Sequence, residues 1–293
     1  MSEAPGSSIV DEVLTKVKDG PVAMSPAKAI QLAGQLYMDG KFAQAANVCR
    51  KIIARAPDNA DAHNILGVAL SAEGKTKDSL AALRRAVKLA PRVSSFHANL
   101  GEVERQRGDL GEARIALRRA VELDPRNAQA YNNLGITHYE KSEYPDAIDC
   151  YRKAIEINPQ FAEAYNNLGN ALRASGDREG ALKAYQDALT WREFYPEAYN
   201  NLGTTLREDE RLPEAEHAYR KAITQNPRYV EAHTNLAALL MAADLDVEAL
   251  RILTEVFKIE PRNPIGLIQT ARIQLRRHNL PAAEQACRMA IED

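Results

Sequence analysis

The chain has 293 residues, of which 45% are apolar and 27% are charged, and its formal net charge is −2. This composition allows a buried core and excludes the large charge excess that draws a protein to nucleic acid or an anionic membrane surface. No stretch approaches the roughly 18 consecutive apolar residues of a membrane-spanning helix, so neither a nucleic-acid partner nor membrane insertion is expected.

The N-terminal sequence and the cysteine content both indicate in which compartment the protein is expected. The first residues, MSEAPGSSIVDEV, lack the basic and apolar regions of a signal peptide. The three cysteines, Cys49, Cys150 and Cys287, have no metal-ligand spacing, and an odd number without a disulfide framework is typical of reduced thiols. We therefore expect a cytoplasmic protein with no metal and no cofactor.

The first predicted element is a short amphipathic helix over residues 7–19, SSIVDEVLTKVKD. Ser8 and Asp11 are suited to cap its start, and Ile9, Val13 and Val17 place apolar side chains on one face. A helix this short is marginal unless it packs against something. Two roles stay open, a cap on the structure that follows or an arm that docks on a partner. We assign residues 1–25 to this arm and its linker.

From residue 26 to residue 293 the chain repeats itself every 34 residues. The string AYNNLG occurs at residues 130–135, 164–169 and 198–203. Prolines recur on the same grid, at Pro57, Pro91, Pro125, Pro159, Pro227 and Pro261. When each proline is counted as position 32, the units begin at residues 26, 60, 94, 128, 162, 196, 230 and 264. Such a period is the signature of a repeat architecture.

Within each unit, two apolar stripes predict two helices. Positions 4, 7, 8 and 11 lie on one face of a first helix, and positions 20, 24 and 27 lie on one face of a second. Position 8 is alanine or glycine, and position 20 is alanine or serine, so the two backbones can approach closely. Glycines mark the turn between the helices at Gly40, Gly74, Gly108 and Gly176. Each unit is thus predicted to be a helical hairpin.

This pattern resembles the tetratricopeptide repeat, and the resemblance covers residues 26–293. It implies an all-α fold, an α-solenoid in which about eight helix-turn-helix units stack as a right-handed superhelix with the first helices lining the concave wall. Each hairpin buries its apolar face only against its neighbours. The departures are local: Glu193 stands where a proline is expected, and the last unit has Thr270 and Gln274 in its packed stripe.

Two irregular regions carry alternatives. Trp191, Phe194 and Tyr195 cluster where the proline is missing, and they predict either a bulky core between repeats or an exposed aromatic patch for a partner. The last unit is rich in Gln and Arg, which predicts a polar cap on the array. Packing of the terminal units against another copy of the chain, and a chain that is the front part of a longer protein, stay open beside this prediction.

Asparagines are expected on the face of the first helix opposite its packed stripe. Positions 2, 6, 9 and 13 form this face, and position 6 holds Asn99, Asn133, Asn167, Asn201 and Asn235. Neighbouring helices lie roughly 8–10 Å apart, so these carboxamides are predicted to form a ladder. A carboxamide both donates and accepts hydrogen bonds, which suits the capture of an extended peptide backbone. The alternative is a soluble face that was copied as the repeats multiplied.

Other groove positions refine the expected ligand. Asn170 at position 9 joins the predicted site, as do three arginines at position 12, Arg105, Arg173 and Arg207. Glutamates on the same wall offset the arginines, so no strongly charged ligand is expected. The asparagines at position 5 (Asn64, Asn132, Asn166 and Asn200) lie nearer the edge and are expected to be solvated or to contact neighbouring repeats. The carboxylate clamp of some tetratricopeptide proteins needs a lysine at position 5, and no unit has one.

No pattern in the chain indicates catalysis. The six histidines are scattered and are interpreted as packing residues, and there is no phosphate loop, zinc motif or nucleophile motif. We therefore expect a protein that is not an enzyme. Its predicted function is a scaffold or adaptor that binds extended peptide segments through the asparagine ladder.

A closer resemblance supplies an alternative function. Residues 158–189, NPQFAEAYNNLGNALRASGDREGALKAYQDAL, are similar to the repeats of O-linked N-acetylglucosamine transferases. In that family an asparagine ladder binds the substrate backbone, and similar arrays precede glycosyltransferase or sulfotransferase domains in bacterial proteins. The resemblance implies a substrate-recruiting array of a longer transferase whose catalytic domain is absent from these residues.

Overall fold

The structure is a computed structural model that describes residues 25–291, so the helix predicted over residues 7–19 lies outside it. All regular elements in the described range are helices. They are α2 (Pro26–Met38), α3 (Phe42–Arg55), α4 (Ala60–Ala72), α5 (Thr76–Leu89), α6 (Ser94–Gln106), α7 (Leu110–Leu123), α8 (Ala128–Glu140), α9 (Tyr144–Ile157), α10 (Ala162–Ala174), α11 (Arg178–Trp191), α12 (Pro196–Glu208), α13 (Leu212–Gln225), α14 (Val230–Ala242), α15 (Asp246–Ile259), α16 (Pro264–Arg276) and α17 (Leu280–Ile291).

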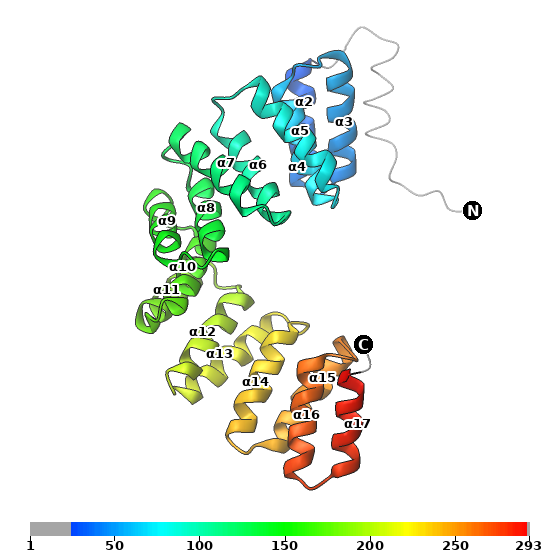
Figure 1. Cartoon of the computed structure of the whole chain (residues 1–293), viewed down its shortest axis with the longest axis vertical. Coiled ribbons are helices and arrows are strands. Elements are labelled where there is room, and N and C mark those ends of the chain that lie inside the picture. Colours follow the sequence, from blue (N-terminus) through cyan, green and yellow to red (C-terminus); the bar gives the residue numbers. More distant parts are fainter. Residues whose placement is uncertain (1–24, 292–293) are drawn as a thin grey trace, which may run out of the picture. The chain divides into compact units, whose positions relative to one another are not determined.

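Consecutive helices pack as hairpins, as the pairs α6–α7 and α10–α11 show (Figure 1). The even-numbered helices, which we call A helices, each begin at the residue from which a 34-residue unit is counted. The odd-numbered helices, called B helices, follow after a short turn. The prediction of an all-α solenoid built from helical hairpins is confirmed.

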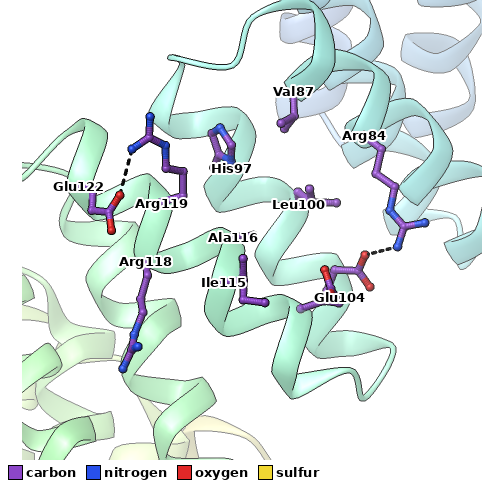
Figure 2. A pocket seen from close by; sticks show the side chains of 11 residues that line it. Arg84, Val87, His97, Leu100, Glu104, Ile115, Ala116, Arg118, Arg119 and Glu122 are labelled. Carbon is purple, nitrogen blue, oxygen red and sulfur yellow. Dashed lines mark hydrogen bonds and ion pairs between the residues drawn. The ribbon is translucent and has the colours of Figure 1, made fainter.

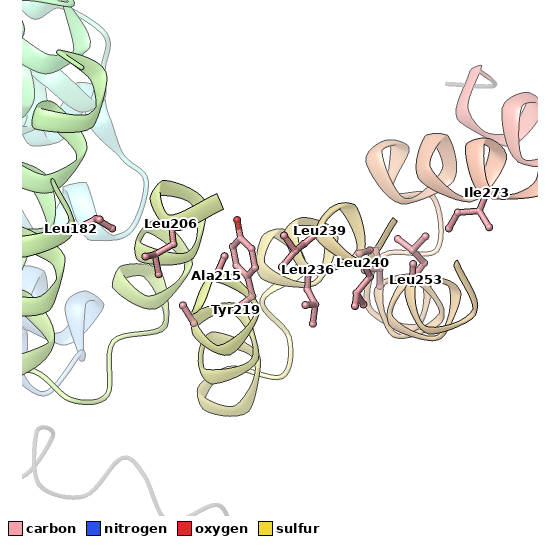
Figure 3. Packing of buried hydrophobic residues seen from close by; sticks show 13 residues of the cluster. Leu182, Leu206, Ala215, Tyr219, Leu236, Leu239, Leu240, Leu253 and Ile273 are labelled. Atoms are coloured by element: carbon pink, nitrogen blue, oxygen red, sulfur yellow. The ribbon is translucent and has the colours of Figure 1, made fainter. Parts of the chain in front are cut away.

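The chain divides into two compact halves, residues 1–143 and residues 144–293. The described N-terminal half holds α2 to α8, and its first core cluster joins Ala33, Ala45, Cys49 and Ala62 from α2, α3 and α4. The C-terminal half holds α9 to α17, and its core runs from Leu182 on α11 to Ile273 on α16 (Figure 3). In each half the apolar core therefore passes from one hairpin to the next, which is how a repeat array gains its stability.

Small residues at position 8 allow each hairpin to close. A Cβ atom added to Gly169 would lie 2.5 Å from Cε1 of Tyr185, and one added to Gly101 would lie 2.6 Å from Cγ of Leu117. Both distances are far below van der Waals contact. The A helix thus packs its bare backbone against a large side chain at position 24 of the B helix, as predicted from the spacing of small residues.

The turn between the A and B helices uses a left-handed residue in every unit. Gly40, Gly74, Gly108 and Gly176 have φ between 74° and 92°, which confirms the predicted glycine turns. The same place holds a residue other than glycine in the remaining units, and there too φ is positive: Ser142, Glu210, Asp244 and His278. Hairpin geometry therefore imposes the left-handed conformation even where the residue disfavours it.

Candidate functional site

The predicted asparagines at position 6 are tied to the preceding repeat. In three adjacent pairs of A helices, the Nδ2 atom of the position-6 asparagine donates a hydrogen bond to Oδ1 of the position-5 asparagine one repeat earlier. The pairs are Asn99 with Asn64 at 2.9 Å, Asn201 with Asn166 at 3.0 Å, and Asn235 with Asn200 at 2.9 Å. In these three pairs, an asparagine at position 6 thus joins its A helix to the A helix of the preceding repeat.

The two asparagines of a doublet differ in exposure. Asn166 and Asn200 are buried between the helices, whereas Asn201 and Asn235 stay half-buried at the surface. The expectation that position-5 asparagines contact neighbouring repeats is confirmed for Asn64, Asn166 and Asn200, and solvated side chains there are excluded for Asn166 and Asn200. Burial of an amide without a partner is costly, and the interhelical bond removes this cost.

Two members of the predicted ladder have other surroundings. Asn133 is buried, and its Oδ1 accepts a hydrogen bond from Nε2 of Gln129 at 2.8 Å, so this side chain is less available than the prediction assumed. Asn167 is half-buried and makes contacts of its own. At the last repeat the same interhelical link is made by Gln269, whose Nε2 donates to the backbone carbonyl of Thr234 at 3.0 Å.

Two of the three predicted groove arginines form ion pairs with the next A helix. Arg105 forms ion pairs with Glu102 on its own helix and with Glu140 on the next A helix of its half. The hydrogen bond with Glu102 raises the pKa of Arg105 above its ordinary value. Arg173 pairs with Glu208 at 2.9 Å in the same register. These pairs cancel most of the positive charge expected on this wall, and Arg207 lies half-buried.

Asn170, the predicted member at position 9, belongs partly to the hairpin core. Its Oδ1 accepts a hydrogen bond from the hydroxyl of Tyr185 at 2.8 Å. In the next repeat, Thr204 accepts the hydroxyl of Tyr219 in the same way, at 3.2 Å. The residue at position 9 therefore accepts the hydrogen bond of the buried tyrosine hydroxyl from the B helix. This leaves Asn170 with fewer hydrogen-bonding sites for a ligand.

At the irregular boundary between α11 and α12, the prediction of a bulky core is wrong for two of three aromatic residues. Trp191 and Phe194 are exposed, with relative accessibilities of 46% and 67%. Tyr195 is half-buried beneath the guanidinium of Arg192, whose Cζ lies 4.8 Å from the ring centroid. Burial raises the pKa of Tyr195 to about 12. α11 still ends at Trp191 without a proline, and the chain restarts as a helix at Pro196.

One pocket was missed by the sequence analysis. It has a volume of about 520 Å³ and lies between α5 and α7 over the floor formed by α6, with Leu100, Ile115 and His97 among its lining (Figure 2). Arg84 at its rim pairs with the buried carboxylate of Glu104 at 2.7 Å. Ile115 is exposed at position 22, where most other repeats carry a polar residue. This isoleucine at a usually polar position was the feature of the sequence that could have indicated the pocket.

The histidines behave as structural residues where their contacts are defined. Nε2 of His63 and of His97 lies 2.8 Å and 3.0 Å from the carbonyl oxygen of the proline that precedes each A helix. His233 and His138 are buried, and His138 pairs with Glu143. Among residues 25–291, no helix combines the length and apolar character needed to cross a bilayer.

Comparisons with known proteins agree with this geometry. Models of the tetratricopeptide repeat match residues 33–91, 101–142, 137–176 and 160–228, which together span more than half of the chain. A search of curated proteins found no match.

Solved structures share the fold. PilF of Pseudomonas aeruginosa is 23% identical with a TM-score of 0.60, over 66% of this chain and 88% of that one. The Cut9–Hcn1 structure matches with 16% identity and a TM-score of 0.67, over 96% of this chain and 55% of that one. YrrB, described as a tetratricopeptide protein with an unusual peptide-binding site, is 23% identical with a TM-score of 0.51, over 64% and 97%. The repeat models, the helical hairpins and these structures place the chain in the tetratricopeptide repeat family.

Proposed function

We propose that the array is a protein-interaction scaffold that binds extended peptide segments along the face of its A helices. The family and the fold support the scaffold role, and a solved relative of the same fold is described as peptide-binding. The proposal assigns the recognition of peptide backbone to half-buried carboxamides at position 6 within each half by itself: Asn201 and Asn235 in the C-terminal half, and Asn99 in the N-terminal half.

The observation that carries the proposal is the fixed orientation of these carboxamides. One N–H of each side chain is held by the preceding repeat, so the amide plane is set before a ligand arrives. Within residues 25–291, the Oδ1 atoms of these three side chains accept no hydrogen bond. Each carboxamide thus retains an acceptor and a second N–H for a peptide amide, and little side-chain entropy is lost on binding.

Spacing sets how often a bound peptide would be touched. Adjacent helices pack at roughly 8–10 Å, and an extended chain advances about 3.3 Å per residue. Where adjacent repeats both offer a carboxamide, as with Asn201 and Asn235, one carboxamide therefore meets a peptide about every three residues. Contacts to the backbone at this interval give affinity that depends weakly on side-chain identity. The paired charges of Arg105 and Arg173 favour neither a strongly acidic nor a strongly basic ligand.

A matched pair of double variants tests this proposal. Asn201→Ala with Asn235→Ala removes the surface carboxamides, and Asn166→Ala with Asn200→Ala removes the buried ends of the same two hydrogen bonds. The probe is the best binder selected from a displayed library of unstructured 12-residue peptides, and its affinity is measured by fluorescence anisotropy. We expect the first double variant to lose at least about tenfold in affinity and the second to lose much less.

Backbone recognition has its own readout. N-methylation of single peptide amides is expected to weaken binding at intervals of about three residues, whereas alanine replacement of peptide side chains is expected to have small effects. Equal losses for both double variants would show that the asparagines act only by holding the helices together, and would refute the proposal.

The recruiting arm of a longer transferase remains a prediction from sequence. The similarity to O-linked N-acetylglucosamine transferase repeats is tested by none of the comparisons. The proposed chemistry of the A-helix face is the same for a scaffold and for a recruiting arm, so the peptide experiment applies to both.

A further inference from the structure

We propose that the exposed face of α16 binds residues 7–19 of a second copy of this chain. The face consists of Ile265, Ile268, Arg272 and Leu275, and we call it the terminal stripe. These residues are spaced by three, four and three, so they lie along one side of the helix. Ile265, Ile268 and Leu275 are 54%, 48% and 50% exposed.

The terminal stripe is unlike the same positions in the preceding repeats of its half. Position 5 holds Asn166, Asn200 and Thr234, and all three are buried at the contact with the following repeat. Position 2 holds glutamate in these repeats, and position 12 holds Arg173, Arg207 and Met241. At positions 2 and 5 the last repeat thus has isoleucine in place of polar contact residues, and at position 12 it has leucine. Nothing within residues 25–291 covers this face.

This pattern is the opposite of the polar cap predicted from the Gln and Arg content of the last repeat. The prediction is wrong for three of the four residues of this face, where Arg272 alone is polar: Gln269 is buried against α14, and Arg276 pairs with Asp244 and Asp246. A terminal repeat that stays free in water needs a polar outer face. Three exposed apolar side chains on one side of the helix instead indicate a surface that is covered in use.

The first repeat shows the contrasting design. Lys28 and Gln35 at positions 3 and 10 of α2 are exposed. The equivalent residues of α4, Ala62 and Ala69, are buried. Because α2 already has a polar outer face, it needs no cap. This removes the main reason to expect residues 7–19 to cover the first repeat.

The sequence of residues 7–19 fits the terminal stripe. The segment has 13 residues, the length of each A helix, and its apolar residues Ile9, Val13 and Val17 are spaced for one helical face. Its first half carries Asp11 and Glu12 without a basic residue. As a helix it would stand where the A helix of a following repeat would pack, with its apolar face on the stripe.

Charge favours this occupant over a symmetric pairing of two stripes. In α16, α17 and their connecting turn, Arg276 pairs with Asp244 and Asp246, and Arg288 pairs with Glu284. Among the described residues, Arg272 and Arg277 are the arginines of this region outside ion pairs. A two-fold pairing would bring Arg272 against a stripe whose one charged residue is also an arginine, whereas Glu12, which flanks the apolar face of the segment, would approach Arg272 with opposite charge. Residues 20–25 span at most about 20 Å and tether the segment to its own α2, and a second copy offers its stripe without that restriction.

Self-association of the full chain tests the inference. Sedimentation velocity over a range of concentrations is expected to show association that increases with concentration, into exchanged dimers or longer assemblies, because each copy offers one segment and one stripe. Ile268→Asp and Val13→Asp, at the two sides of the contact, should each weaken association by at least about tenfold. Ile115→Asp, which changes another exposed isoleucine outside the stripe, should leave association unchanged.

A peptide experiment separates the possible occupants. A fluorescent peptide of residues 5–21 should bind a chain that starts at residue 21 and should lose at least about tenfold in affinity when that chain carries Ile268→Asp. Circular dichroism checks that each variant keeps its helices. The inference is overturned if the chain stays monomeric and the peptide does not bind, or if the segment docks within a monomer. Association that Ile268→Asp abolishes and Val13→Asp leaves intact would also overturn it, since the stripe would then meet another surface.

Discussion

Replacing Gly169 by alanine tests the packing rule on which every hairpin depends. The new methyl group would lie 2.5 Å from Cε1 of Tyr185 and 2.7 Å from its Cδ1, while ordinary contacts are 3.4–4 Å. Tyr185 is fully buried, so its ring or the helix must move by about 1 Å. Overpacking of this kind costs roughly 1–3 kcal/mol, and the higher helix propensity of alanine returns about 1 kcal/mol. Because a contact of 2.5 Å belongs in the upper half of the overpacking range, the expected net loss is about 1–2 kcal/mol.

Urea denaturation followed by circular dichroism measures this loss, and Gly34→Ala is the matched control. Gly34 also lies within an A helix, but a Cβ added there meets nothing within 4 Å. Alanine at this site should therefore stabilise the protein by up to about 1 kcal/mol. The same substitution chemistry is expected to have opposite signs at the two glycines, which no argument from helix propensity alone predicts.

A second variant asks whether the ring is the cause. Repeat 7 already combines alanine at position 8 with leucine at position 24, as Ala237 and Leu253 in one buried cluster. Tyr185→Leu should therefore reduce the cost of Gly169→Ala when the two are combined, in a double-mutant cycle. If Gly169→Ala is as stable as the parent chain, or if its cost is unchanged beside Tyr185→Leu, the close approach of A and B helices is not what selects glycine.

Three further outcomes are expected. Glu210→Gly should raise the free energy of unfolding by about 1 kcal/mol, since φ at Glu210 is 59°; an unchanged urea midpoint would contradict this. Burial raises the pKa of the Cys49 thiol to about 12. At pH 8 a disulfide reagent should therefore modify the exposed Cys287 quickly and Cys49 only on unfolding. Above pH 9 the thiol of Cys49 ionises in the unfolded chain but not in the folded one, so the free energy of unfolding should fall as the pH rises. A double-mutant cycle of Asn166→Ala and Asn201→Ala should give a coupling energy of about 0.5–1.5 kcal/mol, and additive effects would show that their hydrogen bond contributes nothing.

The interactions within a hairpin were open to prediction because they repeat at short range. Position 8 is small since the B-helix residue at position 24 packs against it, and this requirement returns every 34 residues. The left-handed turn residue is glycine in half of the units, which was enough to locate it at Gly108 and Gly176. The same turn at Glu210 could not be read from its letter, because only the register of the two helices forces φ to be positive there.

The candidate site was harder to predict because it depends on contacts between repeats. Positions 5 and 6 are one residue apart, and spacing alone placed both of them away from the packed stripe. The structure shows that Asn166 is buried and that Asn201 reaches back to it from the next repeat. Likewise, the sequence predicts Arg105 as a positive charge available in the groove, yet Arg105 is ion-paired with Glu102 and Glu140. A carboxamide or guanidinium is long enough to choose among partners on two helices, and sequence does not fix that choice.

By itself, the sequence determined the period, the helical hairpin and the small residues that let its helices touch, because these follow from steric requirements that recur in each unit. Tertiary structure decided which polar side chains form hydrogen bonds and ion pairs between repeats and which stay at the surface. It also decided that Trp191 and Phe194 are exposed and that Ile268 and Leu275 lie uncovered at the last repeat. The exposure of a side chain depends on what packs against its helix from the next repeat. The residue type and its spacing within the repeat do not predict that contact.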